Sequence, residues 1–98
     1  MKHKIRGGIS MIEKQYNITS AEGIHARPAS VLVGALAPFK SDITLEWNDK
    51  KVNLKSILGV MSLGVSSGAN INIVANGEDE EQAMAKVAEI METQGIGN

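Results

Sequence analysis

Residues 43–54, Ile-Thr-Leu-Glu-Trp-Asn-Asp-Lys-Lys-Val-Asn-Leu, contain two short runs in which apolar and polar side chains alternate. Alternation of this kind is typical of half-buried strands, and the Asn48-Asp49 pair between the runs favours a tight turn. The segment therefore predicts two antiparallel strands with one face against a core. The apolar positions of that face are Ile43, Leu45, Trp47, Val52 and Leu54.

Two helices are predicted on either side of this hairpin. Apolar residues at positions i, i+3, i+4 and i+7 predict a helix over 26–37. Pro38 would end it, because the residue before a proline is pushed out of the helical region. Residues 57–63 predict a short apolar helix that begins after Ser56 as N-cap.

Further alternation predicts strands within residues 12–18 and 71–75. A last helix is expected to begin at Asp79, with Gln82 as its capping-box partner, and to end near Gly95. The resulting order is βαββαβα. It predicts an α+β fold in which helices cover one face of an antiparallel sheet.

The composition is typical of one globular domain and excludes several classes of site. The chain has 98 residues, of which 43% are apolar and 21% charged, and its net charge of −1 gives no general attraction to nucleic acid. Cysteine is absent and His3 and His25 are the only histidines, so we expect no disulfide, no metal centre and no bound cofactor. No apolar run approaches the roughly 20 residues of a membrane span, so we expect a cytoplasmic protein without membrane insertion.

Residues 1–10 are expected to form an N-terminal extension outside the domain, which we place at 11–98. They carry three basic residues and a Gly7-Gly8 pair without an amphipathic period. Strand-like sequence begins at Met11, so our hypothesis is that the start is mis-assigned and that translation begins there. The alternatives are a disordered tail and the remnant of an expression tag.

The first motif with candidate reactive residues is Gly23-Ile24-His25-Ala26-Arg27-Pro28-Ala29-Ser30. Pro28 suits the first turn of a helix, which places His25 at or just before the helix start. The positive end of the helix disfavours an imidazolium ion, so the ring stays neutral and nucleophilic. Backbone N–H groups of the first turn and the Arg27 guanidinium can bind the oxygens of a phosphoryl group attached to the ring.

Two other interpretations of His25 stay open on the spacing alone. The histidine can simply cap the helix, since a single His next to an Arg is common. It can also be the general base of a small hydrolase, although Glu22 is the nearest acid and no Asp-His or Ser-His pair is visible.

A second motif, residues 54–63, combines Ser56 with the short apolar helix. A phosphate on a residue at a helix N-terminus is favourable, so modification of Ser56 need not unfold the helix. A helix this short cannot bury all of its apolar side chains, and those left exposed would mark a protein partner. The alternative is that all of them are core. The residues expected near one face are Ile57, Leu58 and Met61.

Together, in this order, the two motifs resemble HPr, the histidine-containing phosphocarrier family of the bacterial phosphoenolpyruvate:sugar phosphotransferase system. Gly23–Ser30 resembles the active-site signature, and Val52–Leu63 resembles the regulatory serine region of the Gram-positive type. The resemblance runs from about Met11 to the C-terminus. The family fold is an open-faced β-sandwich, a four-stranded antiparallel sheet with three helices on one face, which agrees with the order βαββαβα.

The resemblance implies a phosphoryl relay. His25 would accept the group through Nδ1 from Enzyme I, with phosphoenolpyruvate as the ultimate donor, and pass it to the IIA domains of sugar permeases. Arg27 would help to stabilise the phosphoryl group. The chain would then be a covalent carrier that Enzyme I phosphorylates, and not a stand-alone catalyst.

The resemblance also implies regulation. Ser56 would be phosphorylated by HPr kinase/phosphorylase, and that form would slow transfer through His25 and act as corepressor with the catabolite control protein. Docking would use Ala26 and the exposed positions of the short helix, Ile57, Leu58 and Met61, on a monomer. The alternative is a purely regulatory, corepressor-type binding protein that acts through phospho-Ser56. A regulatory paralogue of the family lacks the histidine, so the presence of His25 favours a role in sugar transport.

The hypothesis about the start codon gives a direct prediction. The mass of the native protein should correspond to a chain that begins at Met11, measured on intact protein from its own host. A mass that includes Met1 would rule the hypothesis out.

Overall fold

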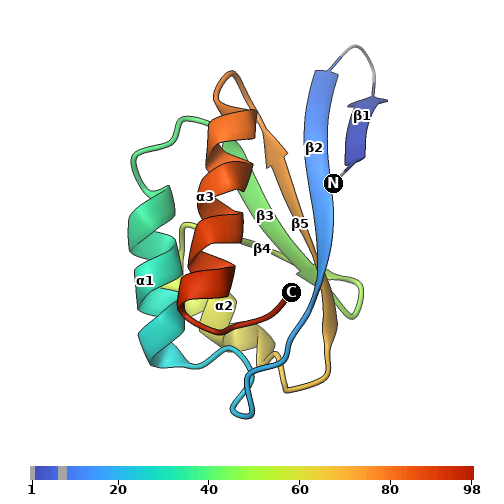
Figure 1. Cartoon of the computed structure of the whole chain (residues 1–98). Coiled ribbons are helices and arrows are strands. Elements are labelled where there is room, and N and C mark those ends of the chain that lie inside the picture. Colours follow the sequence, from blue (N-terminus) through green and yellow to red (C-terminus); the bar gives the residue numbers. More distant parts are fainter. Residues whose placement is uncertain (1, 7–8) are drawn as a thin grey trace.

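The computed structural model describes the backbone of residues 2–6 and 9–98, and the side chains from Met11 onward. The described strands form one antiparallel sheet in the order β1-β2-β5-β3-β4, with three helices on one face and the other face open (Figure 1). The elements are β1 (Lys2–Arg6), β2 (Ile9–Asn17), α1 (Ala26–Leu36), β3 (Asp42–Trp47), β4 (Lys50–Asn53), α2 (Ile57–Leu63), β5 (Asn70–Asn76) and α3 (Glu80–Thr93). The predicted open-faced α+β fold, with its four antiparallel strands β2 to β5, is confirmed.

The β3–β4 hairpin forms where the alternation predicted it. Leu45 pairs with Val52 and Trp47 with Lys50, which leaves Asn48 and Asp49 as a two-residue turn. Both turn residues have left-handed backbones, with φ of 53° and 62°. Asn and Asp tolerate this conformation better than other residues with a β-carbon, so the turn closes without a glycine.

The strand β1 is a finding that the sequence analysis did not predict. Residues 2–6 pair with residues 9–13 of β2, in a register that sets Lys2 opposite Glu13 and Arg6 opposite Ile9. The structure therefore differs from the alternative of a disordered tail. A signal was present, because a Gly-Gly pair between two short runs is typical of a hairpin. Gly7 and Gly8 lie outside the described residues, and translation from Met11 stays a prediction.

The C-terminus covers the other end of the same edge of β2. The Asn17 N–H donates to the Asn98 carbonyl (2.8 Å), the Asn98 N–H donates back (3.0 Å), and Ile18 forms a bridge with Gly97. Peptide groups along an antiparallel strand face its two neighbours alternately, so those of residues 9, 11, 13, 15 and 17 face this edge. The pairing partners leave only Gln15 of that series uncovered, and an edge with few open peptide groups resists pairing with another chain.

The core lies between the sheet and the helices. The strands contribute their inward positions, and α1 and α3 contribute the stripes that the helical spacing predicted. Burial of such side chains contributes about 1.5–3 kcal/mol each. Fully buried large side chains are Ile12, Ile18, Leu32, Leu36, Ile43, Leu45, Leu54, Ile71, Ile73, Met84, Met91 and Ile96.

The expected capping box at the start of α3 is wrong. The Asp79 side chain makes no capping hydrogen bond to its own helix. Its carboxylate instead accepts hydrogen bonds from the backbone N–H groups of Lys40 (2.8 Å) and Ser41 (2.9 Å) and from the Ser41 hydroxyl. These bonds lower the pKa of Asp79 to about 2, the Ser41 hydroxyl first. The carboxylate therefore joins the α1–β3 connection to the start of α3, whereas Glu80 accepts from the Gly77 N–H (3.1 Å).

Two glycines with open space around them give a matched test of backbone conformation. A β-carbon at Gly34, inside α1, or at Gly64, after α2, would have no heavy atom within 4 Å, but only Gly64 has a left-handed backbone (φ 64°). We expect Gly34→Ala to raise the free energy of unfolding by about 0.5–1 kcal/mol, because glycine is a poor helix former. We expect Gly64→Ala to lower it by about 1–2 kcal/mol. Urea unfolding measures both changes. Changes of the same sign would contradict the assignment of a helical backbone to Gly34 and a left-handed backbone to Gly64.

The hydrogen bonds of Asp79 predict a pH dependence of stability. Because its folded-state pKa of about 2 lies below the ordinary value of 3.8, ionised Asp79 stabilises the fold above the ordinary value, and this contribution is lost as the pH falls towards 2. Asp79→Asn should therefore be less stable than wild type at pH 5, and the difference should shrink by pH 2. Ser41→Ala, which keeps the backbone donors, should show a smaller effect. Urea unfolding across this pH range tests the prediction. A stability difference between Asp79→Asn and wild type that stays undiminished at pH 2 would contradict it.

Candidate functional site

The turn between β2 and α1 is fixed by a glycine pressed against another loop. Gly23 has a left-handed backbone (φ 68°), and a β-carbon there would lie 2.2 Å from the Val65 carbonyl oxygen. The Gly23 N–H closes a turn on Ser20 (3.0 Å), and the N–H of buried Ile24 donates to the same Val65 oxygen (3.1 Å). The Gly-Ile dipeptide of the first motif therefore positions the backbone immediately before His25.

His25 is the N-cap residue of α1 in an extended conformation (φ −105°, ψ 177°). Its carbonyl accepts the hydrogen bond from the Ala29 N–H (3.1 Å), but its side chain makes no capping bond. The interpretation of His25 as a mere helix cap is therefore wrong. The imidazole is 40% exposed, which makes it accessible to another protein.

The first turn of α1 offers backbone donors beside the ring. Helix geometry leaves the N–H groups of Ala26 and Arg27 without an intrahelical acceptor, and Pro28 has none to offer. The positive end of the helix dipole lies at the same place. Arg27 is exposed and has no hydrogen bond or ion pair with a residue in the described part of the chain. Its guanidinium is thus free to bind an anion on His25.

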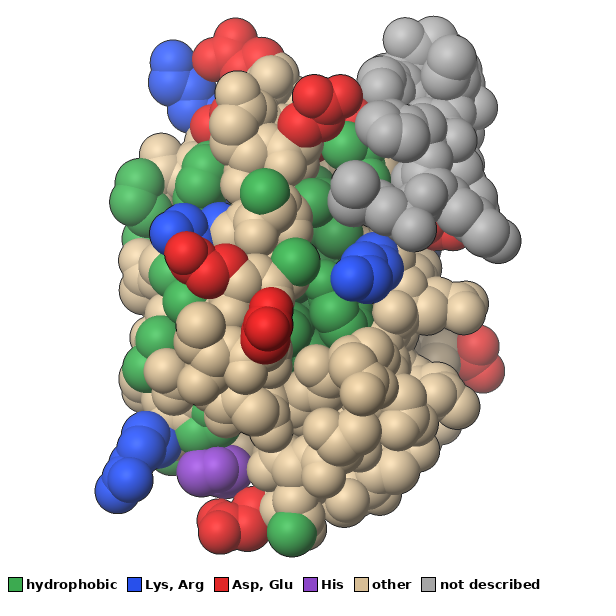
Figure 2. Space-filling model, in the orientation of Figure 1, with side chains coloured by type: hydrophobic (Ala, Val, Ile, Leu, Met, Phe, Trp, Pro, Cys, Tyr) green, Lys and Arg blue, Asp and Glu red, His purple; other side chains and the backbone are tan. Residues whose placement is uncertain are grey.

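The structure also brings an acid to the ring. Oε2 of Glu22 lies 3.8 Å from Nδ1 of His25, and the Glu22 side chain is 76% exposed. This is an ion-pair distance, longer than a hydrogen bond, so it does not make the pair of a general-base dyad. The sequence analysis named Glu22 only as the nearest acid, although its separation of three residues could have indicated a contact. Figure 2 shows a histidine side chain open to solvent at one end of the molecule, with an acidic and a basic side chain close by.

The second motif lies at the same end of the molecule, where α2 is next to the start of α1 (Figure 1). Ser56 is the N-cap of α2, as predicted, and its Oγ accepts from the Gly59 N–H (3.1 Å). Val60 and Leu63 are buried, which the sequence left open. Leu58 and Met61 of the same helix are exposed, so the interpretation of every apolar side chain of α2 as core is wrong.

Three large apolar side chains are exposed among the described residues, and all lie on α1 or α2. Leu58 is 82% exposed, Met61 is exposed, and Ile57 is half-buried. Val31 of α1 is the third, and sequence reasoning did not name it. A signal was present, because Val31 lies outside the i, i+3, i+4, i+7 stripe to which Leu32 and Leu36 belong. Exposed apolar side chains on two neighbouring helices are typical of a protein-binding surface.

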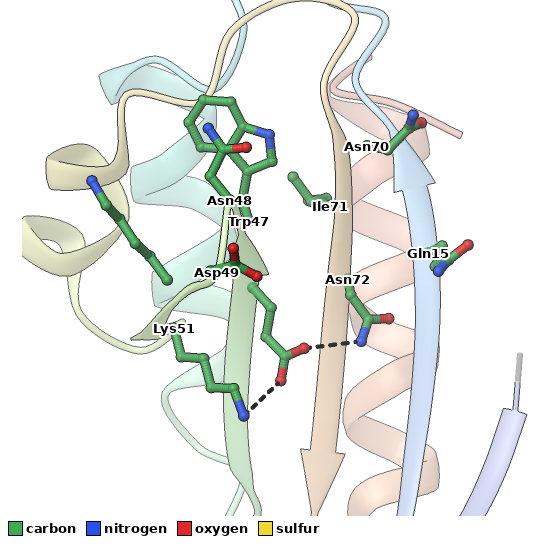
Figure 3. A pocket seen from close by; sticks show the side chains of 10 residues that line it. Gln15, Trp47, Asn48, Asp49, Lys51, Asn70, Ile71 and Asn72 are labelled. Atoms are coloured by element: carbon green, nitrogen blue, oxygen red, sulfur yellow. Dashed lines mark hydrogen bonds and ion pairs between the residues drawn. The ribbon is translucent and has the colours of Figure 1, made fainter.

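A cavity of roughly 700 Å³ lies on the open face of the sheet and does not include His25 (Figure 3). Its walls include Trp47 of the hairpin and the side chains of one row across the sheet. In that row Asn72 donates to Glu46 (3.2 Å), and Glu46 pairs with Lys51 (3.7 Å). No group of acidic and histidine side chains in residues 11–98 is arranged to hold a metal ion. His25 therefore lies at an exposed helix end and not inside this cavity.

Comparison with known proteins gives a consistent picture. The sequence profile "PTS HPr component phosphorylation site" matches residues 12–93, so β1 precedes the matched region. The fold is similar to a histidine-containing phosphocarrier protein of Mycoplasma, with 38% identity and a TM-score of 0.87 over 89% of this chain and 99% of that one. It is also similar to HPr of Thermoanaerobacter tengcongensis, with 43% identity and a TM-score of 0.79 over 84% of this chain and 92% of that one.

A regulatory relative also matches. Crh, the catabolite repression protein of Bacillus subtilis, is 45% identical, with a TM-score of 0.66 over 74% of this chain and 84% of that one. Its crystal structure is an intertwined dimer with a swapped domain.

Proposed function

Because this chain belongs to the HPr family, the phosphocarriers of the phosphotransferase system that serves sugar transport, we propose that it relays a phosphoryl group from phosphorylated Enzyme I to the IIA domains of sugar permeases through a phosphohistidine on His25. The observation that carries the proposal is the exposed imidazole at the N-cap of α1 beside two free backbone donors. A carrier must meet a donor and an acceptor in turn, and an open site allows both.

Phosphoryl transfer at His25 needs no further group of this chain as nucleophile. The Nδ1 lone pair attacks phosphorus, the new P–N bond forms, and the bond from phosphorus to the donor breaks. The N–H groups of Ala26 and Arg27, the positive end of α1 and the Arg27 guanidinium would bind the transferred oxygens. Transfer to the acceptor reverses these changes and returns the lone pair to Nδ1.

The proposed docking surface for the partners consists of Ala26, Ile57, Leu58 and Met61, next to the site. The exposure of Leu58 and Met61 supports it, since their burial by a partner would remove apolar surface from water. Methionine adapts to differently shaped partners because its side chain is flexible. The strand β1 lies at the other end of the molecule from the start of α1 (Figure 1), so the N-terminal segment leaves this surface accessible.

Ser56 is the proposed regulatory site. Phosphorylation by HPr kinase/phosphorylase would place a phosphate at the start of α2, beside the docking residues, where it would slow the relay and allow binding to the catabolite control protein as corepressor. The half-buried Ser56 hydroxyl already accepts from the Gly59 N–H, and a phosphate oxygen could accept the same donor. The similarity to Crh supports a regulatory role. A purely regulatory protein acting through phospho-Ser56 is the alternative that the first experiment below excludes or supports.

The carrier is proposed to act as a monomer in the cytoplasm, where Enzyme I and the IIA domains would reach it. In the part of the chain that the structure describes, no helix has the length and apolar character needed to cross a membrane. The covered edge of β2 supports the monomeric state.

Intact-protein mass after incubation with phosphoenolpyruvate, magnesium and Enzyme I tests the acceptor. Wild type should gain one acid-labile phosphoryl group and His25→Ala none. His3→Ala is the matched control, because it removes the other histidine, and it should behave like wild type. Phosphorylation of His25→Ala would contradict the assignment. If wild type gains nothing while a control carrier does, the regulatory alternative takes its place.

The regulatory site is tested with ATP and an HPr kinase. Wild type and Ser62→Ala should gain one acid-stable phosphate, and Ser56→Ala none; Ser62 is an exposed hydroxyl of the same helix. The phosphorylated wild type should then accept a phosphoryl group from Enzyme I more slowly than unmodified protein. A phosphate on Ser56→Ala, or an unchanged rate, would speak against the proposal.

A further inference from the structure

We propose that Glu22 sets the strength with which His25 holds its phosphoryl group. Its carboxylate favours the dephosphorylated imidazole and repels a phosphoryl group on Nδ1, so it makes phospho-His25 a stronger donor. Glu22 would be a positioning residue that acts through His25. This inference rests on the function proposed above and deepens it.

The position of Glu22 is set by the backbone. Glu22 belongs to the turn that the Gly23 N–H closes on the Ser20 carbonyl (3.0 Å). A β-carbon on the next residue, Gly23, would lie 2.2 Å from the Val65 carbonyl oxygen, so this backbone is packed against the other loop. The exposed Glu22 carboxylate therefore belongs to a turn whose backbone is fixed, and its Oε2 lies 3.8 Å from Nδ1 of His25.

The Nδ1 atom that faces Glu22 is the one that would carry the phosphoryl group. Before transfer, the Nδ1 atom that attacks phosphorus carries a lone pair and no phosphoryl charge. After transfer, a phosphoryl group with a charge of about −1.5 to −2 on Nδ1 faces the Glu22 carboxylate. The repulsion between these negative charges exists only in the phosphorylated state, so it favours the dephosphorylated state.

Two charged residues lie within four positions of His25 in the chain, and they act in opposite directions. Arg27 attracts the phosphoryl oxygens, whereas Glu22 repels them. A carrier has to accept a group and give it away, so its free energy of phosphorylation must lie between those of donor and acceptor. A pair of opposed exposed charges can adjust that free energy without changing the nucleophile.

The equilibrium with phosphoenolpyruvate measures this free energy directly. In the coupled reaction the P–O bond of phosphoenolpyruvate breaks and the P–N bond to Nδ1 forms. The enolate takes up a proton from solvent to give pyruvate. Enzyme I is only the catalyst, so a defect in docking changes the rate and not the final ratio of phosphorylated to free carrier.

The experiment equilibrates each variant with catalytic Enzyme I, magnesium and a fixed mixture of phosphoenolpyruvate and a large excess of pyruvate. Intact-protein mass gives the ratio of phosphorylated to free carrier. For Glu22→Gln we expect this ratio to rise roughly 3- to 10-fold, the range for an exposed charge acting on a doubly charged group. Glu22→Asp keeps the charge and should stay closer to wild type. The matched control is Glu81→Gln, which removes the same charge at the far end of α3 (Figure 1).

Salt separates an electrostatic effect from a structural one. The phosphorylated-to-free ratio of Glu22→Gln, divided by that of wild type, should fall towards one as the salt concentration rises from about 0.05 M to about 0.5 M. The reason is that added ions screen exposed charges. An unchanged or lowered ratio for Glu22→Gln, an equal rise for Glu81→Gln, or an effect that salt does not alter overturns the proposal. If wild type takes up no phosphoryl group under any mixture, the proposed function fails, and this inference with it.

Discussion

The contact between Gly23 and the carbonyl of Val65 is the constraint on which the candidate site depends. Any side chain at Gly23 would overlap that oxygen, and the oxygen also accepts the Ile24 N–H. The β2–α1 connection and the α2–β5 connection are thereby held together. His25 follows the first connection directly, and α2 precedes the second, so one backbone contact keeps His25 and the exposed apolar helix at the same end of the molecule.

The one-sided arrangement of helices explains why the candidate site is at a helix end. Helices that all pack on one face of the sheet can bring their termini together at its end, where backbone N–H groups remain free for an anion. The open face has no such donors, because its strands pair with each other. Its side chains bind one another instead, as Asn72 does when its amide donates to both Glu13 and Glu46.

Exposure limits how much the site can do alone. An exposed imidazole with two backbone donors and one arginine can hold a phosphoryl group, but the protein builds no walls around it to exclude water. Partner surfaces must provide the rest of the environment during transfer. This division agrees with a carrier of the HPr family. Under the proposals above, Glu22 and Arg27, the two charged residues near the ring, would adjust the strength of the P–N bond.

Most of the secondary structure could be predicted from the sequence, because period and capping are local properties. The alternation around Asn48-Asp49 located β3 and β4, and the spacing of Leu32 and Leu36 located α1. The first motif indicated a histidine at a helix start, and the structure places His25 there. The range 57–63 for α2 agrees with the structure, because Ser56 and Gly64 mark its two ends locally.

Contacts between distant segments were decided only by the tertiary structure. The sequence predicted Asp79 as a helix cap. Its carboxylate instead accepts hydrogen bonds from the N–H groups of Lys40 and Ser41, because packing brings the α1–β3 connection within reach. The burial of Val60 and the exposure of Leu58 depend on which neighbour covers each face of α2, and the nearly all-apolar sequence of this 7-residue helix does not indicate which face that is. The approach of Glu22 to His25 depends on the turn held against Val65. Sequence periodicity reports which side of an element is apolar, whereas such contacts depend on where the chain returns in space.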